Sequence, residues 1–358
     1  MKIGILTLPL HSNYGGILQA YALYTTLQRM GHTVTLIDDK VYSIDTLKEK
    51  LSLLRWNIFR LVGLKTGLHP QLHTKEEMAN ILPFINRYLS NQISMSRINE
   101  HTFDAIIVGS DQVWRGLYST DLMRYFLNFT KGWKIHRWAY AASFGISNWT
   151  QPQNVLQECR KFLHDFDYVS TREKSGTDIC RKLLDRVDAD WVIDPTMLLS
   201  PNDYLSLCTD VPVSSKSKLL YYILDENEDT QSILNTISKC RKIETENINK
   251  FVDGKHKNSI EYWLRSIAES DYMFTDSFHG TVFSILFNKP FIVYGNKERG
   301  LSRFETLLSM TGLTNRFISD AKQIDAIIDN EIDWNEVNKL INQQQTRCLS
   351  IISMLLKS

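Results

Sequence analysis

The segment that follows Thr275 contains the residue type best suited to proton transfer near neutral pH. His279 stands in Asp276-Ser277-Phe278-His279-Gly280, between an apolar stretch and a helical pattern. A histidine at such a junction predicts acid/base chemistry, and Ser277 predicts a helix cap or a phosphate ligand. The alternative interpretation is a capping box with a structural histidine.

A loop near the N-terminus is the second candidate. Asn13, Tyr14, Gly15 and Gly16 separate an apolar stretch from a helical pattern. Glycines let backbone N–H groups approach a ligand, and a helix N-terminus favours an anion. The spacing is not the dinucleotide fingerprint, although Asp38 lies where that fingerprint places its ribose-binding acid. A tight turn that needs glycine is the alternative.

Two cations follow predicted strands. Arg172 comes after a buried stretch, where its planar fork suits a carboxylate or a phosphate. Lys297 follows the stretch Pro290–Val293. The alternatives are an ion pair of Arg172 with Glu173 or another surface acid, and a solvated charge run around Lys297.

Two further polar loops hold the remaining candidates. Ser110, Asp111 and Trp114 follow the stretch Ala105–Val108, and Ser143 follows another apolar stretch. Asp111 is suited to orient a hydroxyl or to act as a base. Trp114 is suited either to stack on a sugar face or to close the core.

These candidates all follow short apolar stretches that alternate with helical patterns, as in parallel α/β sheets. In such sheets, ligands bind beyond the carboxyl ends of the strands. We therefore expect two Rossmann-like domains that face a cleft between the loops at Asn13–Gly16 and Asp276–Gly280. The expected strands are 2–8, Val34–Asp38, Ala105–Val108, Arg137–Ala142, Asp167–Ser170, Leu219–Leu224, Tyr272–Thr275 and Pro290–Val293.

A stretch rich in Ser, Pro and Asp at 199–217 places the expected boundary between domains 1–205 and 206–358. The first is expected to be the acceptor side, and the second to end in a helix over 333–357. At 358 residues the chain exceeds one ordinary core, and 43% apolar residues favour a folded protein. Residues 41–100 carry no clear periodicity beyond expected helices.

Composition and motifs exclude several classes of function. A net charge of +1 gives no case for a nucleic-acid partner. The five cysteines have no metal-site spacing and suit a reducing compartment. From the cysteines we therefore expect a cytoplasmic protein with no metal. No run of 18 apolar residues is present, so we expect no transmembrane segment.

Taken together, these segments resemble the polysaccharide pyruvyltransferase family over roughly residues 2–305. Six short motifs match in order. Lys297 matches a lysine that in this family often follows the strand after the last of these motifs. The motifs are Asn13-Tyr14-Gly15-Gly16-Ile17-Leu18-Gln19-Ala20, Val108-Gly109-Ser110-Asp111-Gln112-Val113-Trp114, Tyr140-Ala141-Ala142-Ser143-Phe144-Gly145, Ser170-Thr171-Arg172-Glu173, Asp194-Pro195-Thr196 and Thr275-Asp276-Ser277-Phe278-His279-Gly280.

The resemblance implies a GT-B-like fold and transfer of a pyruvyl group from phosphoenolpyruvate to a sugar, which forms a pyruvate ketal in exopolysaccharide or cell-envelope biosynthesis. It implies acid/base work for His279 and, on the acceptor side, for Asp111. Phosphoenolpyruvate is the donor substrate and no cofactor is needed. The resemblance leaves open whether a lipid or a nucleotide carries the acceptor sugar, and a lipid-linked acceptor would require only peripheral membrane contact. The implied substrate-binding residues are Asn13, Tyr14, Gly15, Gly16, Ser110, Trp114, Ser143, Arg172, Ser277 and Lys297.

Three other functions stay open. A GT-B-type glycosyltransferase would use a nucleotide-sugar donor. A non-catalytic protein would bind a sugar or nucleotide without turnover. A nicotinamide oxidoreductase would need the degenerate glycine loop to hold a dinucleotide.

Overall fold

The computed structural model describes residues 1–38, 55, 75–119, 121–212, 218–251, 253–295 and 300–357. The chain divides into two compact units, each with its own sheet. Unit 1 comprises Met1–Leu198 and Cys348–Ser358, and unit 2 comprises Leu199–Arg347.

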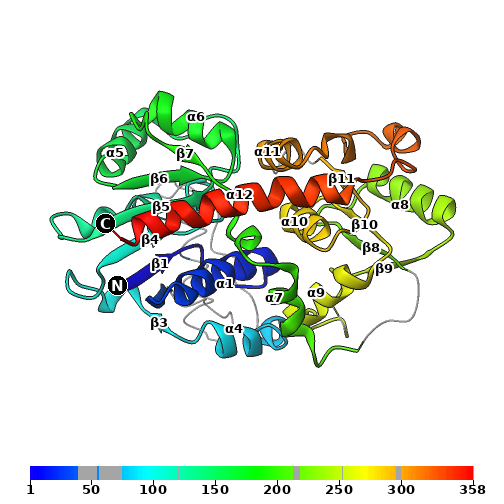
Figure 1. Ribbon diagram of the computed structural model, residues 1–358, viewed down its shortest axis with the longest axis horizontal. Coiled ribbons are helices and arrows are strands. Elements are labelled where there is room, and N and C mark those ends of the chain that lie inside the picture. The colour runs from blue at the N-terminus through cyan, green and yellow to red at the C-terminus, as the bar shows by residue number, and fades with distance from the viewer. Residues whose placement is uncertain are drawn as a thin grey trace. The chain divides into compact units, whose positions relative to one another are not determined.

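Unit 1 is built on a seven-stranded sheet in which every neighbouring pair is parallel. The strand order is β3-β2-β1-β4-β5-β6-β7, so the chain winds outward in both directions from β1 and β4 (Figure 1). Because all the strands run parallel, their carboxyl ends lie at one edge of the sheet. The strands are β1 (Lys2–Leu6), β2 (Thr33–Ile37), β3 (Gln92–Ile93), β4 (Ala105–Val108), β5 (His136–Ala142), β6 (Tyr168–Thr171) and β7 (Asp190–Trp191).

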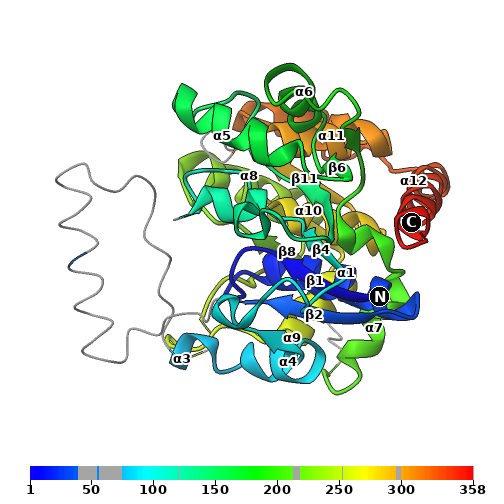
Figure 2. The ribbon, with the colours of Figure 1, turned by 90° about the vertical axis from the view of Figure 1, so that its left-hand side faces the viewer.

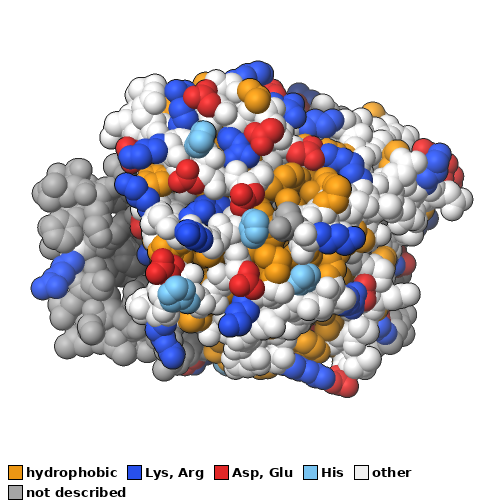
Figure 3. Space-filling model, turned by 60° about the vertical axis from the view of Figure 1, so that its left-hand side comes forward, with side chains coloured by type: hydrophobic (Ala, Val, Ile, Leu, Met, Phe, Trp, Pro, Cys, Tyr) orange, Lys and Arg blue, Asp and Glu red, His pale blue; other side chains and the backbone are white. Residues whose placement is uncertain are grey.

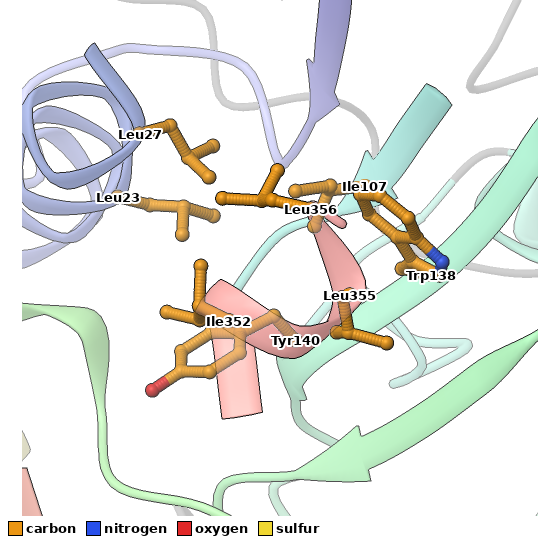
Figure 4. A pocket seen from close by; sticks show the side chains of 8 residues that line it. All are labelled: Leu23, Leu27, Ile107, Trp138, Tyr140, Ile352, Leu355 and Leu356. Atoms are coloured by element: carbon orange, nitrogen blue, oxygen red, sulfur yellow. The ribbon is translucent and has the colours of Figure 1, made fainter. Parts of the chain in front are cut away.

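Alternate residues of β4 pack on opposite faces of this sheet. Ile106 and Val108 belong to a core cluster with Leu163 of α5 and Ile179 of α6, whereas Ile107 faces α1 and α12 (Figure 4). All four residues of β4 are buried, as expected for a central parallel strand with both faces covered. The helices are α1 (Tyr14–Arg29), α5 (Gln153–Leu163), α6 (Lys174–Leu183) and α12 (Trp334–Leu355).

The last turns of α12 pack against the sheet of unit 1. Leu23 and Leu27 of α1, Trp138 and Tyr140 of β5, and the end of α12 line one small apolar cavity (Figure 4). These contacts return Cys348–Ser358 to the first unit. The division therefore differs from the expected domains 1–205 and 206–358, and its boundary falls after Leu198.

Unit 2 is built on a five-stranded parallel sheet in the order β12-β11-β10-β8-β9. Its strands are β8 (Lys218–Tyr222), β9 (Glu244–Asn247), β10 (Tyr272–Thr275), β11 (Phe291–Tyr294) and β12 (Phe317–Ile318). Its helices are α7 (Pro201–Leu205), α8 (Glu228–Arg241), α9 (Ile260–Glu269), α10 (Phe278–Leu286) and α11 (Ser302–Thr311). The first part of α12 also belongs to this unit.

Shorter elements complete the described chain. In unit 1, α4 packs on α1 through Tyr21, whose ring contacts those of Phe84 and Tyr88, and α3 lies next to α4 (Figure 2). In the two units together, the shorter elements are α3 (Lys75–Met78), α4 (Leu82–Tyr88) and the 3₁₀ helices η1 (Met95–Arg97), η2 (Leu122–Phe126), η3 (Asn128–Thr130), η4 (Pro195–Leu198), η5 (Ser206–Cys208), η7 (Thr314–Arg316) and η8 (Ala321–Ala326).

The surface carries charges of both signs. On the face drawn in Figure 3, basic and acidic side chains are interspersed, in keeping with the net charge of +1. Within the described parts of the chain, no helix combines the length and the apolar character that crossing a bilayer requires.

Candidate functional site

The carboxyl edge of the unit 1 sheet gathers five of the polar residues that follow its strands. Ser110 and Asp111 follow β4, Ser143 follows β5, Arg172 follows β6 and Asp194 follows β7. All five are buried. The strand order brings these residues together although more than 80 positions separate the first from the last.

Arg172 and Asp194 form the central ion pair of this edge. Nη1 of Arg172 donates to Oδ2 of Asp194 over 2.8 Å, and both side chains are 1% exposed. The other terminal nitrogen, Nη2, lies 3.8 Å from Oδ1 of Asp111. A guanidinium has five N–H donors, so one side chain can serve both carboxylates and a further acceptor.

Asp194 is itself held firmly. Its Oδ1 accepts from the backbone N–H and the hydroxyl of Thr196, at 2.9 and 2.7 Å. Its Oδ2 accepts from Ser110 Oγ at 3.1 Å in addition to Arg172. Asp194 appeared in the sequence only as part of a matched motif. Its role as the partner of Arg172 had no local signal.

Electrostatics favours a permanently charged Arg172. Burial by itself would lower the pKa of its guanidinium, but Asp194, Asp111 and Glu173 outweigh that effect and the pKa is raised. Arg172 therefore does pair with an acid, but its partner is the buried Asp194 and not Glu173 or a surface acid. Glu173 instead accepts from the N–H groups of Phe144 and Gly145.

Asp111 has an unusual backbone conformation. Its φ of +80° is uncommon for a residue with a side chain, and a bridge to Ala142 with the bond from Ser143 N to Asp111 O holds it there. Its Oδ2 lies 3.2 Å from where a Cβ on Gly16 would stand. Strained backbone of this kind clusters at functional sites, although five other residues with side chains also have a positive φ among those that the structure describes.

The predicted loop Asn13–Gly16 is instead the first turn of a helix. Asn13 is the N-cap of α1, and its Oδ1 accepts from the N–H of Gly16 at 3.2 Å. Tyr14, Gly15 and Gly16 are therefore helical, and Tyr14 is buried. A Cβ on Gly16 would lie 3.2 Å from side-chain atoms of both Asn13 and Asp111. The N-terminus of α1 therefore lies beside Asp111.

Glu173 is a second carboxylate with a supporting role. It is fully buried, and its Oε1 accepts from the N–H groups of Phe144 and Gly145 at 2.8 and 3.0 Å. Gly145 has φ +69°, and the side chain of Gln112 occupies the space that a Cβ would need. Glu173 therefore fixes the turn after β5, which carries Ser143.

Trp114 is a core residue. It is 1% exposed, its ring stacks on Phe126 and contacts Phe144, and its Nε1 donates to Tyr125 O over 3.0 Å. Of the two interpretations of Trp114, the structure supports closure of the core. Stacking on a sugar would require an exposed ring face.

Asp38 is a second acidic position of unit 1. Asp38 follows β2 and is partly buried, and burial raises the pKa of its carboxyl to about 6. Burial also raises the pKa of the Tyr125 hydroxyl, and the charges of Asp38 and Asp111 raise it further. Tyr125 thus lies within electrostatic range of both acids. The sequence had singled out Asp38 only by its distance from the glycines.

In unit 2, His279 lies in the first turn of α10. The helix begins at Phe278, within the segment predicted to be a loop, because Oγ of Ser277 accepts from the N–H of Gly280 at 3.3 Å and caps it. The predicted loop Asp276–Gly280 is thus mostly helical. His279 is 7% exposed and its ring contacts that of Phe278.

Asp276 ties two loops of unit 2 together. Its Oδ1 accepts from Leu224 N at 2.7 Å, and its Oδ2 accepts from Asp225 N at 3.0 Å. Asp276 is 2% exposed. It therefore holds the turn after β8 against the N-terminus of α10.

Lys297 lies outside the described residues. Arg303 of α11 is buried, and its guanidinium carbon lies 5.5 Å from the centre of the Phe278 ring. The sequence had not singled out Arg303 as a candidate for the site. Among the residues that the structure describes, no group of three or more His, Cys, Asp or Glu side chains could hold a metal ion.

Comparisons with known proteins agree on the family and the fold. A family model described as polysaccharide pyruvyl transferase matches residues 13–298. A search of curated proteins found no match. Among solved structures, UDP-GlcNAc 2-epimerase from Neisseria meningitidis bound to UDP-GlcNAc is 13% identical, with a TM-score of 0.52 and coverage of 100% of both chains.

Two other solved structures show the same likeness. S. aureus MnaA with UDP has a TM-score of 0.52 at 11% identity, covering 100% of this chain and 97% of that one. Arabidopsis thaliana UGT89C1 complexed with UDP has a TM-score of 0.50 at 11% identity, covering 96% and 94%. At such low identity the likeness shows the fold alone, and it confirms the predicted GT-B-like class.

Proposed function

The chain belongs to the polysaccharide pyruvyl transferase family, and from that premise we propose that it transfers a pyruvyl group from phosphoenolpyruvate to two hydroxyls of a sugar. The observation that carries the proposal is His279 at the N-terminus of α10. A helix N-terminus favours an anionic ligand, and a histidine there combines anion binding with proton transfer.

The proposed reaction balances with no redox step. His279 gives a proton to the methylene carbon of phosphoenolpyruvate, so that C2 becomes electrophilic. One sugar hydroxyl adds to C2 and loses its proton, and the C2–O bond to phosphate breaks. The second hydroxyl adds to C2 and closes the ketal. Of the two hydroxyl protons, one returns to His279 and replaces the proton that it gave to carbon, and the other leaves with the phosphate.

We assign the acceptor role to the edge of the unit 1 sheet. Asp111 is the proposed base for a sugar hydroxyl, and its strained backbone near Gly16 supports that assignment. Arg172 stays a proposed ligand of the donor's anionic groups, because its planar guanidinium can give paired hydrogen bonds to a carboxylate or a phosphate. Ser110 and Ser143 are buried beside it, and Asn13 is exposed.

The test combines donor binding with turnover. Calorimetric titration of the wild-type protein with phosphoenolpyruvate, and separately with a uridine-diphosphate sugar, identifies the donor. Phosphate release is then followed with methyl hexosides, UDP-sugars and polyprenyl diphosphate sugars as acceptors, and NMR detects the new ketal methyl group. We expect saturable phosphoenolpyruvate binding and a ketal with one acceptor class.

The matched variants test the assigned roles. His279→Asn is expected to lower turnover by at least about a hundredfold, whereas His101→Asn is a control because that side chain is 85% exposed. Arg172→Ala is expected to weaken phosphoenolpyruvate binding. Wild-type turnover in His279→Asn would remove His279 from the mechanism, and binding of the UDP-sugar alone would favour a glycosyltransferase.

A further inference from the structure

Helix α11 in unit 2 starts without a side-chain cap. Its N-cap residue is Leu301, whose apolar side chain offers no hydrogen-bond acceptor. By contrast, α8, α9 and α10 are capped by Asn227, Ser259 and Ser277. The first amides of a helix have no acceptor within the helix and attract an anion, so α11 offers this edge of unit 2 an uncapped N-terminus.

Ser302 adds a buried hydroxyl to this turn. It is the first residue of α11 and is 3% exposed. Its Oγ has no hydrogen-bond partner among the described residues. A buried hydroxyl is normally bonded, so such an atom requires an explanation, and a missing ligand is one. This observation is independent of the helix end itself.

Arg303, the next residue, adds a guanidinium, which is positively charged, planar and able to donate paired hydrogen bonds. It is 7% exposed, and its guanidinium carbon lies 5.5 Å from the centre of the Phe278 ring. The ring of His279 lies 5.2 Å from that of Phe278, centre to centre. Arg303 and His279 therefore pack on the same aromatic ring. Glu305, the acidic residue in the first turn of α11, is exposed, so solvent screens its negative charge.

We propose that the N-terminus of α11, with Ser302 and Arg303, binds the phosphate group of a small phosphate monoester. The site has the groups that phosphate recognition uses, namely backbone N–H groups, a hydroxyl and a guanidinium. If the proposed function holds, this monoester is the donor, with its phosphate at Arg303 and its methylene carbon toward His279, both beside the Phe278 ring. The identification as donor site rests on the proposed function, but the anion site does not.

The adjacent strands explain why the two helix ends are neighbours. β10 and β11 pair in parallel, and α10 and α11 follow them at the same edge of the sheet. Phe278 starts α10 and also contacts Phe304 of α11 at 6.0 Å between ring centres. The helix that carries the proton donor and the helix that binds the phosphate are thus joined by aromatic packing.

The experiment is a calorimetric titration with inorganic phosphate and with phosphoenolpyruvate. Ser302→Ala removes the hydroxyl, and Ser309→Ala on the exposed side of the same helix is its control. We expect about tenfold weaker phosphate binding in Ser302→Ala, about a hundredfold loss in Arg303→Gln and an unchanged affinity in Ser309→Ala. Arg303→Lys is expected to recover part of the affinity because it keeps the charge.

The outcomes separate this inference from the proposed function. Phosphate binding that both variants lose, in a protein that never turns over phosphoenolpyruvate, supports the anion site and rejects the donor chemistry. Normal transfer with unchanged phosphate affinity in folded Ser302→Ala and Arg303→Gln rejects the anion site alone. A wild-type protein that does not bind phosphate also rejects it. If Arg303→Gln does not fold, Ser302→Ala decides by itself.

Discussion

Arg172 donates to Asp194 over 2.8 Å, and each of these side chains is 1% exposed. The same distance joins Arg186 to Asp188 in the same unit, where the Asp188 side chain is 61% exposed. Burial, and not distance, therefore distinguishes the two pairs. A buried charge that loses its partner is costly, whereas an exposed carboxylate contributes less to its pair, and the buried Arg186 also keeps the carbonyls of Leu163 and Phe166 as acceptors.

The first prediction uses this contrast. Asp194→Asn is expected to lower the free energy of unfolding by about 3 kcal/mol, because it leaves the buried charge of Arg172 poorly compensated. Asp188→Asn is expected to cost less than about 1 kcal/mol. Urea unfolding of both variants measures the difference. Equal losses would show that the buried pair has no special role.

The second prediction concerns Glu173, whose Oε1 accepts from two buried N–H groups. Glu173→Ala is expected to cost about 3 kcal/mol, because it leaves both groups without an acceptor. Glu173→Gln keeps an acceptor oxygen and should cost less. Glu158→Ala, an exposed change on α5, is the control. A Gln variant as unstable as the Ala variant would contradict the proposed support of the turn after β5.

The third prediction is a pH dependence. Burial raises the pKa of Asp38 from 3.8 to about 6, so between these values the folded protein binds more protons than the unfolded chain. The contribution of Asp38 to stability is therefore most favourable below about pH 4 and falls as the pH rises through 6.

Asp38→Asn should remove this loss. The variant is expected to be more stable than wild type at pH 8, by up to about 3 kcal/mol, and to converge with it near pH 4. Urea unfolding between pH 4 and 8 measures this, with the exposed Asp165→Asn as control. A stability difference that does not vary with pH would refute the assignment.

The fourth prediction concerns the end of α12. Ile352 is buried against the unit 1 sheet, and Ile352→Ala is expected to cost about 3 kcal/mol through the cavity it leaves. Met354 on the same turns is 63% exposed, so Met354→Ala should change stability by less than about 0.5 kcal/mol. Thermal unfolding of both variants distinguishes a packed helix end from a loosely attached one.

Buried strands were predictable from the sequence. β4 and β10 occupy the predicted ranges Ala105–Val108 and Tyr272–Thr275, because a strand covered on both faces is a short apolar run. β9, with the sequence Glu-Thr-Glu-Asn, was not predicted. It is an edge strand with exposed or half-buried side chains, so it lacks the apolar pattern.

Helix starts were predicted less well than helix existence. Both α1 and α10 begin earlier than their apolar patterns suggest, because Asn13 and Ser277 cap them. The polar first turns looked like loops in the sequence. Capping depends on one side-chain hydrogen bond, which hydrophobic periodicity does not report.

By itself the sequence determined the α/β class, the family and the set of polar segments at the ends of strands, because these depend on local apolar runs and short motifs. Only the tertiary structure decided which of those residues meet. Arg172 stands next to Glu173 in the chain, yet it pairs with Asp194, 22 positions away, because β6 and β7 are neighbours in the sheet. In unit 2, the pairing of β10 with β11 likewise places Arg303 next to Phe278. Partners across a parallel sheet follow strand order, which is a long-range property that no local pattern encodes.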